Sequence, residues 1–158
     1  RLLGTKLSIT AGKPQTTRHQ ILGVWTEGDT QLAVIDIPGI HQSASRALNR
    51  SLNRAARGAL EEADVLVWVI DVTRFTAEDE LVAGLVRQAG KPLVIVLNKI
   101  DRVPDKTALL PKLAELSATY QPVAVVPFSA LKEKSGARVA SELVKLAKPG
   151  EWAFEEDD

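Results

Sequence analysis

With 158 residues, the chain has the length of one ordinary domain, which is enough to bury a single hydrophobic core. Lys plus Arg and Asp plus Glu number 20 each, so the formal net charge is +0 and no overall field draws the domain to nucleic acid or to an acidic membrane surface. The absence of cysteine excludes disulfides and thiolate metal sites, and the apolar runs are far shorter than the roughly 20 residues of a membrane span.

The first residues of the sequence are unusual. The chain contains no methionine, and it opens with Arg1-Leu2-Leu3-Gly4, which is typical of the last turn of a helix closed by a glycine. Because a helix also needs a beginning, we expect the sequence to be part of a longer protein.

The first half of the chain predicts a β-hairpin and a helix. Residues Gln20–Thr26 and Thr30–Ile35 flank the turn-rich tripeptide Glu27-Gly28-Asp29, which indicates two antiparallel strands. Between Arg46 and Ala63, apolar residues recur at helical spacing with arginines between them. This pattern predicts an amphipathic helix.

The second half predicts three strands, each followed by a helix. The continuous apolar runs Val65–Ile70, Leu93–Leu97 and Val123–Val126 are typical of strands buried on both faces, as in parallel sheets. Helices are expected over Thr76–Ala89, with Thr76 as N-cap and Gly90 closing it, over Lys106–Ser117, where Pro111 disturbs the start, and over Gly136–Ala147. This alternation predicts an α/β fold with a doubly wound, mostly parallel sheet that carries one antiparallel hairpin strand.

Polar clusters follow three of the predicted strands. They are Asp36-Ile37-Pro38-Gly39, Asn98-Lys99-Ile100-Asp101 and Ser129-Ala130-Leu131. In an open α/β sheet, ligands bind beyond the carboxyl ends of the strands. The three clusters are therefore expected to lie at one edge of the sheet and to form a ligand site.

The second and third clusters suit the recognition of guanine. The carboxylate of Asp101 can accept both hydrogens that guanine offers on N1 and on its exocyclic amino group, whereas adenine presents the opposite pattern. Asn98 can bond the N7 edge of the base and tie neighbouring loops together. The stem of Lys99 can lie over the base or ribose while its ammonium stays in water. Backbone N–H groups near Ala130 can donate to the guanine carbonyl oxygen.

The first cluster suits the phosphate end of a nucleotide. Asp36 is placed to hold a Mg²⁺-bound water, and the N–H of Gly39 can approach a γ-phosphate because no side chain obstructs it. Taken alone, Asp-x-x-Gly is more often an ordinary turn, and Ser after a strand is a common N-cap. Asn-Lys-x-Asp closing an apolar strand is more specific. The three clusters in this order favour a nucleotide site.

These motifs make the chain resemble a translation-factor-type GTPase, and more closely the Era family. The sharper match is Pro14-Gln15-Thr16-Thr17-Arg18-His19, followed by Ile21 and Gly23, which resembles the first switch of Era. The resemblance implies a P-loop NTPase-like (Ras-like) fold. Residues 1–150 would form a partial Era-type G domain, and residues 151–158 an acidic linker or tail toward a KH domain that the sequence lacks.

The resemblance also implies cofactors and roles for single residues. GTP or GDP and Mg²⁺ would be the cofactors, with Thr17 coordinating the metal and Asp36 holding it through water. The catalytic set would be Thr17, Asp36 and Gly39, and the nucleotide would be bound by Asn98, Lys99, Asp101, Ser129, Ala130 and Leu131. The whole protein would be a GTP-hydrolysing switch in small-subunit assembly, binding small-subunit ribosomal RNA and the 30S subunit through the KH domain. It would be a cytoplasmic monomer, with a peripheral contact on the inner face of the cell membrane.

Two departures from the family pattern leave alternatives open. The Gly-x-x-x-x-Gly-Lys-Ser/Thr phosphate loop is absent, and its preceding first strand is expected to be missing too, so the hairpin and the other strands lose their shared neighbour. Ile40 follows Gly39, where many small GTPases have a water-orienting Gln, which predicts slow intrinsic hydrolysis. The alternatives are a GTPase-like interaction module that has lost nucleotide binding, or a related GTPase of tRNA modification.

Overall fold

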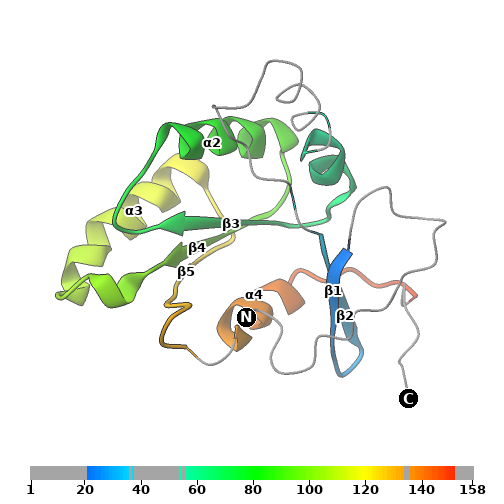
Figure 1. Ribbon diagram of the computed structural model, residues 1–158. Helices are drawn as coiled ribbons and strands as arrows, with labels where there is room; N and C mark the ends of the chain where they lie inside the picture. Colours follow the sequence, from blue (N-terminus) through cyan, green and yellow to red (C-terminus); the bar gives the residue numbers. More distant parts are fainter. Residues whose placement is uncertain (1–20, 36, 38–53, 55, 134–135, 152–158) are drawn as a thin grey trace.

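The computed structural model describes residues 21–35, 37, 54, 56–133 and 136–151. Within these ranges the chain is an α/β structure with a three-stranded parallel sheet and a two-stranded antiparallel hairpin (Figure 1). The predicted α/β class, with parallel strands and one hairpin, is confirmed. Among the described strands, the hairpin and the parallel strands form two sheets rather than one.

The hairpin consists of β1 (Ile21–Glu27) and β2 (Thr30–Ile35). Its turn contains Gly28 at φ +55°, a left-handed backbone conformation that a residue with a side chain adopts only with strain. The strands pair from Glu27 opposite Thr30 back to Ile21 opposite Ile35, with a register shift between Ile21 and Gly23. The turn-rich tripeptide therefore closes the hairpin where the sequence predicts it.

The parallel sheet has the order β3-β4-β5, with β4 in the centre. It is made of β3 (Leu66–Asp71), β4 (Leu93–Asn98) and β5 (Ala124–Pro127). Asp71 lies opposite Asn98, and Leu97 lies opposite Pro127. Because the strands are parallel and in this register, their carboxyl ends reach the same edge of the sheet.

Helices cover both faces of the parallel sheet. Helices α2 (Ala77–Ala89) and α3 (Leu109–Tyr120) lie on one face, and α4 (Ala137–Val144) lies on the other (Figure 1). Residues 56–62 are helical as well, whereas the predicted start of that helix at Arg46 lies outside the described residues. In the described ranges, no helix is both long enough and apolar enough to cross a membrane.

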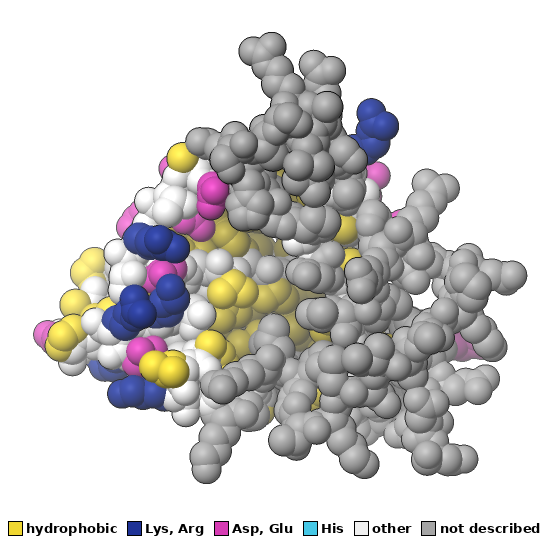
Figure 2. Space-filling view, viewed as in Figure 1, with side chains coloured by type: hydrophobic (Ala, Val, Ile, Leu, Met, Phe, Trp, Pro, Cys, Tyr) yellow, Lys and Arg dark blue, Asp and Glu magenta, His cyan; other side chains and the backbone are white. Residues whose placement is uncertain are grey.

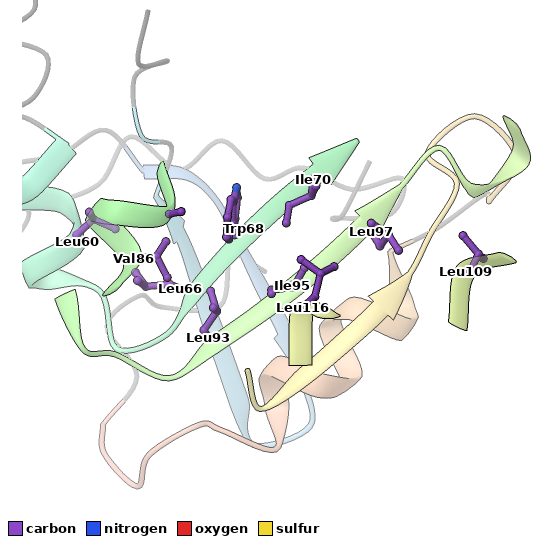
Figure 3. Close-up of a cluster of buried hydrophobic side chains, with 11 residues drawn as sticks. Leu60, Leu66, Trp68, Ile70, Val86, Leu93, Ile95, Leu97, Leu109 and Leu116 are labelled. Carbon is purple, nitrogen blue, oxygen red and sulfur yellow. The ribbon is translucent and has the colours of Figure 1, made fainter. Parts of the chain in front are cut away.

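The larger core cluster lies between the sheet and helices α2 and α3 (Figure 3). Trp68 is buried there and meets Tyr120 edge to face, with ring centroids 5.0 Å apart, and Phe75 at 6.2 Å. A second cluster packs Val94, Val96 and Val126 against α4 on the opposite face. β4 therefore lies between two cores, and all of its residues except Asn98 are buried.

The prediction that Val65–Ile70 is buried on both faces is wrong for the described structure. In β3, Leu66, Trp68 and Ile70 are buried, but Val67 and Val69 are 37% and 51% exposed. Helix α4 packs on this second face against residues of β4 and β5, and Val67 and Val69 stay exposed. A continuous apolar run cannot distinguish a strand covered on two faces from one covered on a single face.

The ends of two helices follow from local chemistry. Thr76 caps α2 through a reciprocal pair of bonds with Asp79, and Gly90 ends the helix at φ +60°. The segment predicted as one helix from Lys106 is instead a 3₁₀ turn, η2 (Lys106–Ala108), followed by α3. Pro111 lies in the first turn of α3, where a backbone N–H would have no helical acceptor.

On the described part of the face in Figure 2, charged side chains of the two signs are not separated. Figure 2 shows lysines and arginines interspersed with aspartates and glutamates on the described part of this face. Several pair along a helix, such as Lys112 with Glu115 and Lys145 with Glu142. This distribution agrees with the net charge of +0.

Candidate guanine-nucleotide site

The site lies where β3, β4 and β5 end together. Asn98 is the last residue of β4, and Asp71 is the last residue of the neighbouring β3. On the other side, the chain leaving β5 stays close to β4, because Phe128 N donates to Leu97 O at 2.9 Å and Ile100 N donates to Phe128 O at 3.3 Å. The structure therefore brings together the two clusters that sequence motifs assign to base recognition.

Asn98 joins the two loops of the site. Its Oδ1 accepts a hydrogen bond from Lys99 N at 2.8 Å and another from Ala130 N at 3.0 Å. The predicted tie between neighbouring loops is present. Sequence reasoning assigns backbone N–H groups near Ala130 to the guanine carbonyl, and in this structure the N–H of Ala130 itself donates to Asn98.

Lys99 makes an ion pair that the sequence motif does not predict. Its backbone adopts φ +66°, a left-handed conformation uncommon for a residue with a side chain. Its ammonium, expected to lie in water, contacts Asp71 Oδ2 at 2.6 Å. The register of β3 and β4 places this carboxylate within reach of the ammonium, while the Lys99 side chain stays 39% exposed.

Asp71 is a part of this edge that the motifs do not reveal. Besides the Lys99 ammonium, it accepts hydrogen bonds from the backbone N and from Oγ1 of Thr73, at 2.9 and 2.6 Å. The hydrogen bond from Lys99, followed by those from Thr73, holds the pKa of Asp71 well below its usual range. The available signal was an acidic residue ending an apolar strand, but only the strand register shows which lysine it meets.

Asp101 and Ser129 form the centre of the site. Ser129 Oγ donates to Asp101 Oδ1 at 2.6 Å, and this bond lowers the pKa of Asp101 below its usual value. Ser129 is 4% exposed, and its Oγ also accepts from Lys132 N at 3.2 Å, as an N-cap would. The two interpretations of Ser129, cap and site residue, are therefore compatible. The carboxylate of Asp101 is kept ionised, which suits it to accept hydrogen bonds from a ligand.

A short turn carries Asp101. The turn is η1 (Ile100–Arg102), in which Arg102 N donates to Lys99 O at 3.0 Å and Val103 N to Ile100 O at 3.1 Å. The ammonium of Lys106 folds back and donates to Ile100 O and, at 2.9 Å, to Val103 O. Sequence reasoning missed Lys106, which lies outside the motif and reaches the loop only through the fold of the chain.

Four predicted site residues remain, namely Leu131 and the three assigned to Mg²⁺ and the phosphates. The side chain of Leu131 is exposed. Thr17, Asp36 and Gly39, assigned to Mg²⁺ and the phosphates, lie outside the described residues. Among the residues the structure describes, no group of three or more His, Cys, Asp or Glu side chains could hold a metal ion.

Comparison with known proteins defines the class. The family model described as 50S ribosome-binding GTPase matches residues 1–99, and the chain belongs to this family of GTPases. Within it, the chain is 46% identical over 157 residues to the protein named GTPase Era from Xanthomonas axonopodis pv. citri (strain 306), covering 99% of this chain and 52% of that protein. The chain thus spans about half the length of the curated relatives it matches.

Two solved structures agree with this assignment. Era in complex with MgGDPNP and nucleotides 1506–1542 of 16S ribosomal RNA matches with a TM-score of 0.79 at 34% identity, over 99% of this chain and 54% of that one. A variant of Aquifex aeolicus Era bound to GDP and AlF₄⁻ gives the same TM-score, identity and coverage. The predicted resemblance to Era and the Ras-like P-loop GTPase fold are confirmed.

Proposed function

We propose that this chain binds guanine nucleotides at the edge formed by Asn98–Asp101 and Ser129–Leu131. The observation that carries the proposal is the hydrogen bond from Ser129 to the carboxylate of Asp101, in a loop that Asn98 ties to the segment after the next strand. In its complete form the protein would act as a GTP-hydrolysing switch of Era type.

The chemistry of Asp101 selects the base. A carboxylate offers only acceptors, and guanine offers two donors side by side, on N1 and on the exocyclic amino group. Adenine has an unprotonated N1, whose lone pair would face the carboxylate. Leaving buried polar groups unpaired costs about 1–3 kcal/mol each, so the arrangement favours guanine by at least an order of magnitude.

The phosphate end of the proposed site uses other residues. Thr17 and Asp36 would hold Mg²⁺, the latter through water, and the N–H of Gly39 would meet the γ-phosphate. Support comes from the two similar Era structures, one containing MgGDPNP and the other GDP with AlF₄⁻. When bound, the metal would neutralise charge on the phosphates. Ile40 has no polar atom for orienting water, which makes slow intrinsic hydrolysis part of the proposal.

The proposed setting is assembly of the small ribosomal subunit. The family description names the 50S subunit, whereas the Era structure that is 34% identical contains a segment of 16S RNA, which belongs to the small subunit. The Era structure is more specific than the family description, so we assign the RNA partner to the 30S subunit. The RNA would be bound by a KH domain beyond the acidic residues 151–158. Residues 1–150 would be the G-domain part of a cytoplasmic monomer that contacts the inner membrane face peripherally.

A titration tests the proposed function. Fluorescently labelled GDP is added to this chain, and to the same chain extended upstream through the phosphate loop that the family pattern contains. We expect tight binding by the extended chain and much weaker binding by this chain, because the phosphate loop supplies most contacts to the phosphates. Competition by unlabelled GDP but not ADP is the specificity control. Absence of binding by both chains would overturn the proposal in favour of an interaction module without nucleotide.

A further inference from the structure

Lys106 is an exposed residue whose ammonium is nevertheless bound to the guanine-reading turn. It donates to the carbonyl oxygens of Ile100 and Val103, the latter at 2.9 Å. The two carbonyls bracket Asp101 in the chain. Lys106 lies outside the Asn-Lys-x-Asp motif, five residues beyond its last member.

The contact between Lys106 and the Ile100 carbonyl affects Asp101 because Ile100 and Asp101 share a peptide group. The carbonyl of Ile100 belongs to the planar peptide group that immediately precedes Asp101. A cation that fixes the orientation of this plane also restricts the direction in which the Asp101 side chain leaves the backbone. Within the turn, the Ile100 carbonyl already accepts from Val103 N, and the ammonium adds a second, cationic donor to it while also binding the Val103 carbonyl.

The backbone that carries Lys106 is fixed by local hydrogen bonds next to the turn. Asp105 accepts hydrogen bonds from the backbone N and from Oγ1 of Thr107, at 2.9 and 2.7 Å, and so caps η2. This local bond fixes the backbone around Lys106 independently of the ammonium. The Lys106 side chain therefore starts from a fixed backbone position, and its two contacts with the carbonyl oxygens have to order only the side chain.

We propose that Lys106 is a positioning residue for guanine recognition: through the Ile100 and Val103 carbonyls it holds the peptide that aims the Asp101 carboxylate at the base. Ser129 holds the same carboxylate from the side of β5, at Oδ1. The inference rests on the proposed guanine-nucleotide function and assigns part of its base specificity to a residue outside the motif.

The test compares two nucleotides that differ only where Asp101 acts. Inosine diphosphate lacks the exocyclic amino group of guanine and carries the same phosphates. The ratio of GDP to IDP affinity therefore reports on the Asp101 contact, and the loss of a positive charge cancels from it. We expect Lys106→Met in the extended chain to lower this ratio about fivefold, the size of one weakened hydrogen bond. Lys106→Arg, which keeps a cationic donor, should restore most of it.

Lys145→Met is the matched control, because Lys145 is an exposed lysine with one ion pair, to Glu142 in α4. It should leave the ratio unchanged. A ratio in Lys106→Met within twofold of the parent, or equal losses for GDP and IDP, would overturn the inference. If Lys106→Met does not fold, Lys106→Gln, which keeps an N–H donor group but loses the positive charge, takes its place and must show an intermediate ratio. Failure of the parent protein to bind GDP would instead overturn the proposed function itself.

Discussion

The hydrogen bond from Ser129 to Asp101 links a buried hydroxyl to the carboxylate that is proposed to bind the base. Because this bond lowers the pKa of Asp101, the carboxylate stays ionised at a lower pH than an isolated one would. The proposed guanine contact needs the ionised form, so we expect binding above the carboxylate pKa and its loss as the pH falls through that pKa.

Ser129→Ala should therefore shift the acidic part of the pH profile of GDP affinity to higher pH. Without the donor, the pKa of Asp101 rises toward its ordinary value, and GDP affinity begins to fall at a higher pH than in the parent protein. Affinity at neutral pH should decrease only a few-fold, because Asp101 remains ionised there. The measurement is GDP affinity at a series of pH values. Ser117→Ala, at an exposed serine of α3, is the control; superimposable pH profiles for the parent and Ser129→Ala would contradict this account.

Asp101→Asn tests the base-reading assignment directly. The amide offers a donor where guanine also has a donor, whereas xanthine has a carbonyl oxygen in place of the exocyclic amino group. GTP affinity should fall on the order of a hundredfold, because a matched polar contact to the base becomes unmatched. XTP affinity should rise, because the contact to its carbonyl oxygen becomes matched. The variant retains an oxygen that can accept from Ser129. Competition of GTP and XTP for the labelled site measures the change, and unchanged GTP affinity would refute the role of Asp101.

At the scale of elements, the ion pair between Asp71 and Lys99 joins the ends of β3 and β4. Asp71→Asn removes the charge and should lower the free energy of unfolding by about 1 kcal/mol at pH 7, a modest value because Lys99 remains partly exposed. The folded pKa of Asp71 is depressed, so its contribution is present above the unfolded pKa and is lost as the pH falls through the folded one. The difference in the free energy of unfolding between Asp71→Asn and the parent protein should become smaller as the pH falls.

Denaturant unfolding between neutral and acidic pH measures this difference. Asp64→Asn is the matched control, because Asp64 pairs with Lys148 at 3.2 Å with both side chains largely exposed. Surface pairs of this kind contribute little, so the control should stay within about 0.5 kcal/mol of the parent. A loss in Asp71→Asn no larger than in the control, or one independent of pH, would show that the pair does not stabilise the sheet edge.

The helices and strands also show which features of the fold local sequence signals can predict. Local signals predicted both ends of α2, because Thr76 and Gly90 act within a few residues of themselves. The same reasoning placed the hairpin turn at Gly28. It did not separate η2 from α3, because a 3₁₀ turn and an α-helix have similar apolar spacing. It also could not show that Val67 and Val69 are exposed, since that depends on what packs against β3.

At the scale of the whole molecule, the motifs predicted the base-binding edge because a parallel sheet delivers all strand ends to one side. Asn98, Asp101, Ser129 and Ala130 meet as that rule requires. Asp71 and Lys106 could not be predicted, because their roles depend on strand register in one case and on a side chain folding back in the other. The phosphate end, with Thr17, Asp36 and Gly39, stays a prediction.

The central position of β4 has a consequence for the timescale on which the site can loosen. β4 is hydrogen-bonded on both sides and covered on both faces. Its amides should exchange with deuterated solvent only when the sheet as a whole opens, and so belong to the slowest-exchanging unit of the domain. Asn98 is the last residue of this strand. The turn proposed to bind guanine is therefore attached to the segment expected to open least often, and local fraying elsewhere leaves its starting point in place.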